Sequence, residues 1–251
     1  MKVLKPALLA LAVTATLATA VFALTNRVNV DEASTQICIS SNGIPDHEIG
    51  QFPNRGNPHS ISAQSINVCV TADPEKGSTA REVRTTGIME NGVIIRPGTA
   101  DYYDASSPRG HSRDRSSGWN LDGMGPDNTL GLDENHAHVD HNGIYHYHGM
   151  PEALEPTSAD TRIGWAADGF EIHYVGSSAK PSYMLKNGTR ATAPGGTYDG
   201  TYNEDFEYVR GYGNLDECNG AILNGEYVYF ATDAYPFFPR CLYGTEITDI
   251  R

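Results

Sequence analysis

Five Asn-Gly dipeptides are spread along the chain, and they constrain its fold more than any other feature. They occur at residues 42–43, 91–92, 142–143, 187–188 and 224–225. Asn-Gly between apolar or alternating residues predicts a β-hairpin, because these residues adopt the left-handed backbone of tight turns. With 26 glycines and 14 prolines among 251 residues, long helices have little room. The pattern predicts one mostly β domain of short antiparallel strands and hairpins, with few short helices.

The segments between these turns are typical of short strands. We expect strands within residues 35–40, 65–71, 82–89, 163–175 and 227–232, with a break at Asp168-Gly169. Residues 151–154 are expected to form a single helical turn. Residues 101–128 are rich in Ser, Arg, Gly, Asp and Pro, and we expect a long, less ordered loop there.

The N-terminus has the pattern of a secretory signal peptide. Lys2 and Lys5 precede an uncharged Ala/Leu/Val-rich run, and small residues allow cleavage after Ala20 or Ala23. A membrane anchor is the alternative, but the run falls short of the roughly 20 strongly apolar residues of a spanning helix. We therefore expect residues 1–23 to be a cleaved signal peptide. Residues 24–251 would then form a secreted or periplasmic domain without a membrane span.

Charge and cysteine content narrow the possible partners and the compartment. The net charge is −13, and loss of Lys2 and Lys5 would make it −15, so nucleic acid is a poor partner and a cation a good one. Four cysteines in an exported chain predict disulfides, with three connectivities possible. We favour Cys38–Cys69 and Cys218–Cys241, because each pair closes a local loop.

Two segments resemble each other, which predicts an internal repeat of a hairpin unit. Each begins with Leu-Asp-Glu (132–134 and 215–217), continues to an Asn-Gly turn, and ends with two tyrosines at alternate positions (145 and 147, 227 and 229). The histidines do not recur. The second segment has Asn219, Ala221, Val228 and Phe230 where the first has His136, His138, His146 and His148. This pattern indicates one scaffold used twice, with a histidine site only in the first copy.

Strand alternation determines which way these histidines point. His136 and His138 share a face of one strand, and His146 and His148 share a face of the next. A two-residue turn would put the two pairs on opposite faces. A three-residue loop, 141–143, pairs Asp140 with Ile144 and His138 with His146, which gives one imidazole face and one apolar, aromatic face. We expect this second register, because it alone separates the two kinds of side chain.

Four imidazoles on one face predict a metal site. Opposed Cβ atoms lie about 4.5–5.5 Å apart, so rings from two strands can reach one ion. Neutral imidazole suits transition metals, and a divalent ion, Cu or Zn, is the expected cofactor. The alternative is a histidine ladder without metal, which would have to explain why the second segment has none. Binding should weaken as pH falls through about 6.5, because a protonated ring cannot coordinate.

Other residues are candidates for a wider site. Asp133 and Glu134 either add carboxylate ligands or orient the imidazoles, although their recurrence at Asp216 and Glu217 argues for a structural role. The remaining candidates are His47, His111, Asp168 and His173. His141 lies in the turn and is expected to be solvated.

The chain resembles the YHYH-domain family of secreted bacterial proteins. The resemblance rests on LGLDENHAHVDHNGIYHYHGMP (130–151) and extends to SNGIPDH (41–47), IGWAADGFEIHY (163–174), GGTYDGTYNEDFEYV (195–209), LDECNG (215–220) and FPRC (238–241). It implies export and this domain but no reaction, because the family has no established activity.

Three classes of function fit these features. The first is an exported metal-binding protein, in metal handling or as a binding module. The second is a metalloenzyme with a three-His site and an open position, either a zinc hydrolase or a copper or iron redox enzyme. The third is a structural or interaction domain without metal. We favour the first, because no general acid or base beside the cluster is identifiable.

Overall fold

The computed structural model describes residues 24–126, 130–154 and 160–250. Strands make up 36% of the structure and no helix reaches seven residues, which confirms the mostly β prediction. The predicted signal peptide lies outside the described residues. Within them, no helix has the length and apolar character needed to cross a membrane.

The secondary structure consists of many short strands and a few 3-10 turns. The strands are β1 (Val28–Glu32), β2 (Gln36–Ser41), β3 (Ile66–Thr71), β4 (Lys76–Glu82), β5 (Gly87–Met89), β6 (Ile94–Ile95), β7 (Gly98–Tyr103), β8 (His111–Ser112), β9 (Asn120–Asp122), β10 (Ala137–Val139), β11 (Tyr145–Tyr147), β12 (Thr161–Ala166), β13 (Glu171–Tyr174), β14 (Tyr183–Leu185), β15 (Phe206–Tyr208), β16 (Gly220–Leu223), β17 (Glu226–Ala231) and β18 (Cys241–Gly244). The 3-10 turns are η1 (Arg115–Ser117), η2 (Glu152–Leu154), η3 (Gly176–Ser178) and η4 (Asn203–Asp205).

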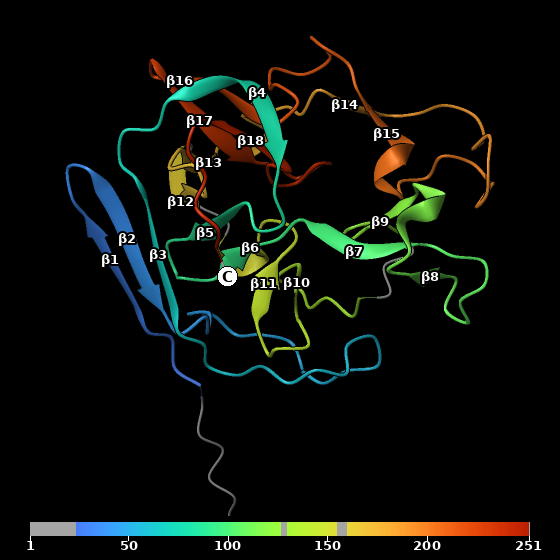
Figure 1. Ribbon diagram of the computed structural model, residues 1–251, viewed down its shortest axis with the longest axis horizontal. Coiled ribbons are helices and arrows are strands. Elements are labelled where there is room, and N and C mark those ends of the chain that lie inside the picture. Colours follow the sequence, from blue (N-terminus) through green and yellow to red (C-terminus); the bar gives the residue numbers. More distant parts are fainter. Residues whose placement is uncertain (1–23, 127–129, 155–159, 251) are drawn as a thin grey trace, which may run out of the picture.

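An eight-stranded sheet organises the molecule, in the order β10-β11-β6-β5-β12-β13-β17-β16 (Figure 1). Its two halves have the same arrangement. In each, an antiparallel pair (β5–β6 or β12–β13) contacts an antiparallel hairpin (β10–β11 or β16–β17) through a parallel pairing. β5 and β12 pair where the halves meet, with Gly87 opposite Ala166 and Met89 opposite Gly164.

A three-stranded sheet, β1-β2-β3, lies along one side of the molecule and closes the main core (Figure 1). Ile37, Ile39 and Val68 from this sheet belong to the same buried cluster as Ile88 and Ile172 of the large sheet. The fold contains both predicted disulfides. Cys38–Cys69 joins directly opposed positions of β2 and β3, and Cys218–Cys241 ties the approach to β16 to the start of β18.

Two sequence predictions about elements were wrong. Residues 82–89 do not form one strand, since β4 ends at Glu82 and β5 begins at Gly87. Residues 101–128 are more regular than expected. β7, β8 and β9 form a three-stranded sheet, and η1 lies between β8 and β9 in the chain. Backbone pairing of β7 with β8 and β9 orders this segment, and its composition gave no sign of that. Residues 127–129 fall outside the described residues.

The two predicted hairpins have matching backbone hydrogen bonds. The His148 N–H donates to the His136 carbonyl (2.8 Å), and the Phe230 N–H donates to the Asn219 carbonyl (2.9 Å). His138 pairs with His146, as Ala221 pairs with Val228. Their polar anchors match as well: Tyr145 donates to Asp133 and Tyr227 donates to Asp216, each at 2.8 Å.

The second hairpin has an apolar cluster where the first has imidazoles. The cluster contains Ala179, Leu215, Val228 and Phe230. Because Phe230 is 4% exposed, we expect Phe230→Ala to cost about 3–5 kcal/mol in the free energy of unfolding. Chemical denaturation measures this cost. The amount of metal bound per folded chain should stay unchanged. A variant that loses metal without losing stability would contradict the interpretation that Phe230 only packs in an apolar cluster.

Candidate functional site: three converging histidines on one hairpin

The histidine hairpin adopts the predicted register. Asp140 donates its N–H to the Ile144 carbonyl (2.9 Å), and the Gly143 N–H donates to the Asp140 carbonyl (2.9 Å). Gly143 has φ 81°, the left-handed conformation that closes a three-residue loop. His138 therefore lies opposite His146. Tyr145 and Tyr147 point to the other face and join the main core, which confirms the predicted separation of faces.

Three of the four histidines meet at one place. His138, His146 and His148 each offer a ring nitrogen, and these atoms lie within 4.8 Å of one another. The ring centroids form a nearly regular triangle, with sides of 4.6, 4.9 and 5.1 Å. The Nε2 atoms of His138 and His146 are 3.1 Å apart. Two ligands bound to one ion at 2.0–2.1 Å in tetrahedral geometry lie about 3.3 Å apart, so this spacing fits a metal site.

Backbone carbonyls orient all three rings. Nδ1 lies 3.1 Å from the Leu130 oxygen in His138, 3.1 Å from the Ile144 oxygen in His146 and 3.3 Å from the Pro97 oxygen in His148. A carbonyl only accepts hydrogen bonds, so in His146 and His148 these contacts favour a proton on Nδ1 and a lone pair on Nε2. Nδ1 of His138 faces both the Leu130 carbonyl, an acceptor, and the Asn57 amide nitrogen, a donor, so its contacts do not select one tautomer. His148 Nε2 is buried and has no hydrogen-bond partner among the described residues. The rings are thus oriented as metal ligands are, with their free nitrogens facing inward.

His136 does not join this group. Its backbone has φ 54°, which ends the strand alternation, and its Nδ1 lies 2.7 Å from the Met150 carbonyl oxygen. The expectation that all four imidazoles line one face was therefore wrong for His136. The corresponding residue of the second hairpin, Asn219, has φ 63°, so the left-handed turn belongs to the hairpin scaffold in both halves.

Burial keeps the three rings neutral. The pKa values of His146 and His148 lie well below the ordinary value for histidine, chiefly because burial penalises the charged form and also because of neighbouring imidazoles and arginines. Burial also lowers the pKa of His138, and the hydrogen bond to the Leu130 carbonyl and the charge of Asp140 oppose this shift. The nitrogens therefore remain available to a metal at lower pH than those of an exposed histidine. The sequence alone suggested that metal binding weakens as pH falls through about 6.5, whereas these pKa shifts predict that binding persists below that pH.

These shifts predict a pH dependence of stability. A histidine whose pKa is lower in the folded protein binds a proton more readily when the chain is unfolded. The free energy of unfolding therefore falls over the pH range in which the unfolded chain binds more protons than the folded one. The metal-free protein should have its full stability above about pH 6.5 and lose it as pH falls below that value. Urea denaturation between pH 7.5 and 5 measures the loss. His146→Val should reduce it, and an unchanged slope would contradict buried, neutral rings.

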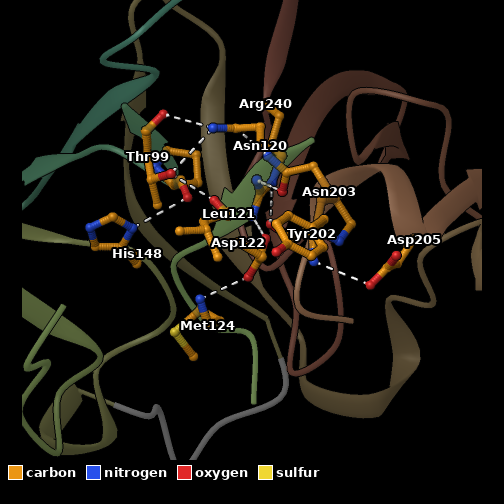
Figure 2. Close-up of polar contacts among 12 residues, drawn as sticks. Thr99, Asn120, Leu121, Asp122, Met124, His148, Tyr202, Asn203, Asp205 and Arg240 are labelled. Atoms are coloured by element: carbon orange, nitrogen blue, oxygen red, sulfur yellow. Dashed lines mark hydrogen bonds and ion pairs between the residues drawn. The ribbon is translucent and has the colours of Figure 1, made fainter. Parts of the chain in front are cut away.

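A glycine allows the neighbouring chain to approach the group. A Cβ atom on Gly123, just after β9, would lie 2.4 Å from Nδ1 of His148. Figure 2 shows His148 beside the segment that carries Asp122 and Met124. We expect Gly123→Ala to displace the His148 ring and weaken metal binding at least tenfold, the size of typical effects of residues that orient ligands. Gly98→Ala is the matched control, because a Cβ there meets nothing within 4 Å. Equal affinities of the two variants in a metal titration would contradict this role.

The additional candidates lie elsewhere. The Asp133 carboxylate accepts from Gly50, Asn135, Ala137 and Tyr145 on the tyrosine side, and Glu134 is exposed. His47 contacts the Tyr147 hydroxyl (2.6 Å), also on that side. His111 pairs with Asp101, and His173 lies between Asp160 and Glu171. Asp168 is buried in the other half of the sheet, where it accepts from the Tyr229 O–H and the Gly244 N–H. The structure brings none of these six into the three-histidine group.

Sequence reasoning missed three residues around the group. The Asn57 side chain is buried, lies 3.2 Å from His138 Nδ1 and donates to the Val139 carbonyl (2.8 Å). Arg96 and Asp140 form a buried ion pair (3.0 Å) beside the rings. The sequence could have indicated Asp140, because it lies two positions after His138 and so shares its face. It could not have indicated Asn57 and Arg96, because only the tertiary fold brings them near.

A mostly β, disulfide-bonded domain with a histidine-lined hairpin is the class that the fold and the site define. Residues 67–244, well over half of the chain, match the YHYH protein family. The chain therefore belongs to the YHYH protein family, as its motifs indicated. No curated protein and no solved structure matches the chain.

Proposed function

We propose that this protein binds one transition-metal ion through Nε2 of His138, His146 and His148, as an exported metal-binding module. One observation carries the proposal. Three imidazoles converge, two of them buried and that of His138 half-buried, while a backbone carbonyl faces the opposite nitrogen of each ring. Two Nε2 lone pairs 3.1 Å apart repel each other unless a proton or a metal ion lies between them. A metal ion bound by all three rings would remove this repulsion and would also give a partner to the buried Nε2 of His148, which has no hydrogen-bond partner among the described residues.

The second hairpin supports this function by contrast. We interpret the two hairpins as copies of one unit, because their registers, polar anchors and left-handed residues match. The scaffold is stable with Ala221, Val228 and Phe230 in place of the three ligands. Buried histidines cost more than apolar side chains, since their polar atoms must be desolvated. Because the histidines occur in only one of the two hairpins, we infer that they are kept for a function and not for folding.

Two disulfides indicate an oxidising compartment, which agrees with export. We propose that residues 1–23 are a signal peptide and that residues 24–251 act outside the cytosol. The negative net charge would raise the local concentration of cations near the protein. Metal handling or metal-dependent binding in this compartment is the role that best fits a buried, three-ligand site.

Metal titration of the apoprotein tests the proposal. Zinc(II), and copper(I) under anaerobic conditions, should be added to wild type and to His138→Ala, which reproduces Ala221 of the second hairpin. We expect at least one ion to bind wild type at one equivalent, and the variant to lose that affinity with its circular dichroism unchanged. Equal affinities of the two proteins for both ions would refute the proposal.

A further inference from the structure

Two arginines lie beside the three-histidine group, and no carboxylate belongs to it. β6 pairs in parallel with β11, with Ile94 at the level of His146, and the Arg96 N–H donates to the Tyr147 carbonyl. This register places Arg96 at the level of His148 on the imidazole face. Arg96 is 6% exposed, and its guanidinium donates to Thr85 (3.0 Å) and pairs with Asp140 (3.0 Å).

The second arginine is Arg240, whose charge also acts on His148. Arg240 pairs with Asp122 (2.5 Å) and donates to Asn203 (2.6 Å), in the polar network that Figure 2 shows next to His148. Asp122 and Asp140 are thus each committed to an arginine. Among the described residues, no acidic group comes close enough to the three rings to count as a fourth ligand.

This distribution of charge discriminates between cations. Imidazole is neutral, so a bound ion keeps its full charge. The cost of burying an ion grows with the square of its charge, and repulsion from an arginine grows in proportion to it. A dication is therefore penalised more than a monocation by burial and by Arg96, and Asp140, which pairs with Arg96 at 3.0 Å, offsets part of that repulsion. Structural zinc sites have four protein ligands, usually including anionic cysteines, and zinc held by three histidines takes water as its fourth ligand. Zinc(II) in this group would therefore need a ligand that the three rings do not supply.

We infer that the three-histidine group selects a monovalent ion, copper(I), over zinc(II), and that Arg96 is the residue that sets this preference. Copper(I) is a closed-shell ion that accepts three ligands, so the triangle of rings can satisfy it without a fourth. The inference rests on the proposed function and goes beyond it, because metal binding alone does not specify the charge of the ion. It differs from the expectation of a divalent ion drawn from the residue types.

The ratio of two affinities tests the inference. Apoprotein is titrated with copper(I) under anaerobic conditions against a chromophoric chelator, and with zinc(II) against a zinc indicator. Wild type should bind copper(I) more tightly. Arg96→Gln should shift the ratio toward zinc(II) by on the order of tenfold, because it removes a positive charge and leaves Asp140 unpaired. Arg96→Lys, which keeps the charge, should leave the ratio near that of wild type.

Asp140→Asn provides a test in the opposite direction. It removes the negative charge and keeps Arg96, so the ratio should move further toward copper(I). This variant also keeps the inference testable if Arg96→Gln does not fold, as judged by circular dichroism. Tighter zinc(II) binding by wild type, or equal ratios in Arg96→Gln and Arg96→Lys, would overturn the inference while leaving metal binding intact. Failure of wild type to bind either ion would overturn the proposed function as well.

Discussion

Replacing His146 with valine should abolish metal binding and leave the fold intact. His146 is buried and contributes one of three converging nitrogens, so its loss leaves two ligands. We expect affinity to fall by more than about 100-fold, because even residues that only orient a ligand are worth 10–100-fold. Valine is chosen because Val228 occupies the corresponding place in the second hairpin, 4% exposed. Titration calorimetry with the ion that wild type binds measures the change.

His136→Asn is the matched control for His146→Val. His136 belongs to the same motif, but its ring contacts the Met150 carbonyl. Asparagine tolerates the left-handed backbone, as Asn219 does in the second hairpin. Wild-type affinity is expected for this variant. If His136→Asn lost metal as completely as His146→Val, four ligands would be needed and the three-residue group would be incorrect.

Tyr147→Ala should have the opposite effect, a large loss of stability with metal binding retained per folded chain. The Tyr147 side chain is 0% exposed, and its hydroxyl contacts His47 Nε2 (2.6 Å) and Asn91 Nδ2 (3.0 Å). Removing a large buried aromatic ring typically costs about 3–5 kcal/mol. Thermal and urea denaturation measure the loss.

A milder variant separates packing from hydrogen bonding at this position. Tyr147→Phe keeps the ring and removes the hydroxyl, so about 1–3 kcal/mol should be lost from the unpaired polar partners. Stoichiometric metal binding by both tyrosine variants is expected at temperatures where they remain folded. A Tyr147→Phe protein of wild-type stability that binds no metal would show that the tyrosine face takes part in binding.

The sequence was sufficient to predict the hairpin and its register. Strand alternation and the Asn142-Gly143 turn determine which side chains share a face, and both are local properties of the chain. His136 departed from the prediction because its positive φ breaks the alternation one residue before β10. Its counterpart Asn219 held a signal for this departure, since asparagine is enriched among residues with positive φ.

The surroundings of the group could not be predicted in the same way. Pro97, Leu130 and Asn57 contact the histidines through tertiary packing, at sequence separations of 51, 8 and 81 residues. The pairing of β4 with β18 likewise joins residues far apart in the sequence. Composition alone suggested a loop over residues 101–128, where β7 pairs with β8 and β9. Both disulfides were predicted because each links residues within one end of the chain.

Metal content measured on the natural protein tests the central claim most directly. The protein would be purified without a histidine tag from the compartment to which it is exported, with no chelator in the buffers. Inductively coupled plasma mass spectrometry then gives the identity and the amount of each metal per chain. The account predicts one equivalent of a transition metal in wild type and almost none in His146→Val. Wild-type protein that carries no transition metal, and takes none up when copper(I) or zinc(II) is supplied, would contradict it.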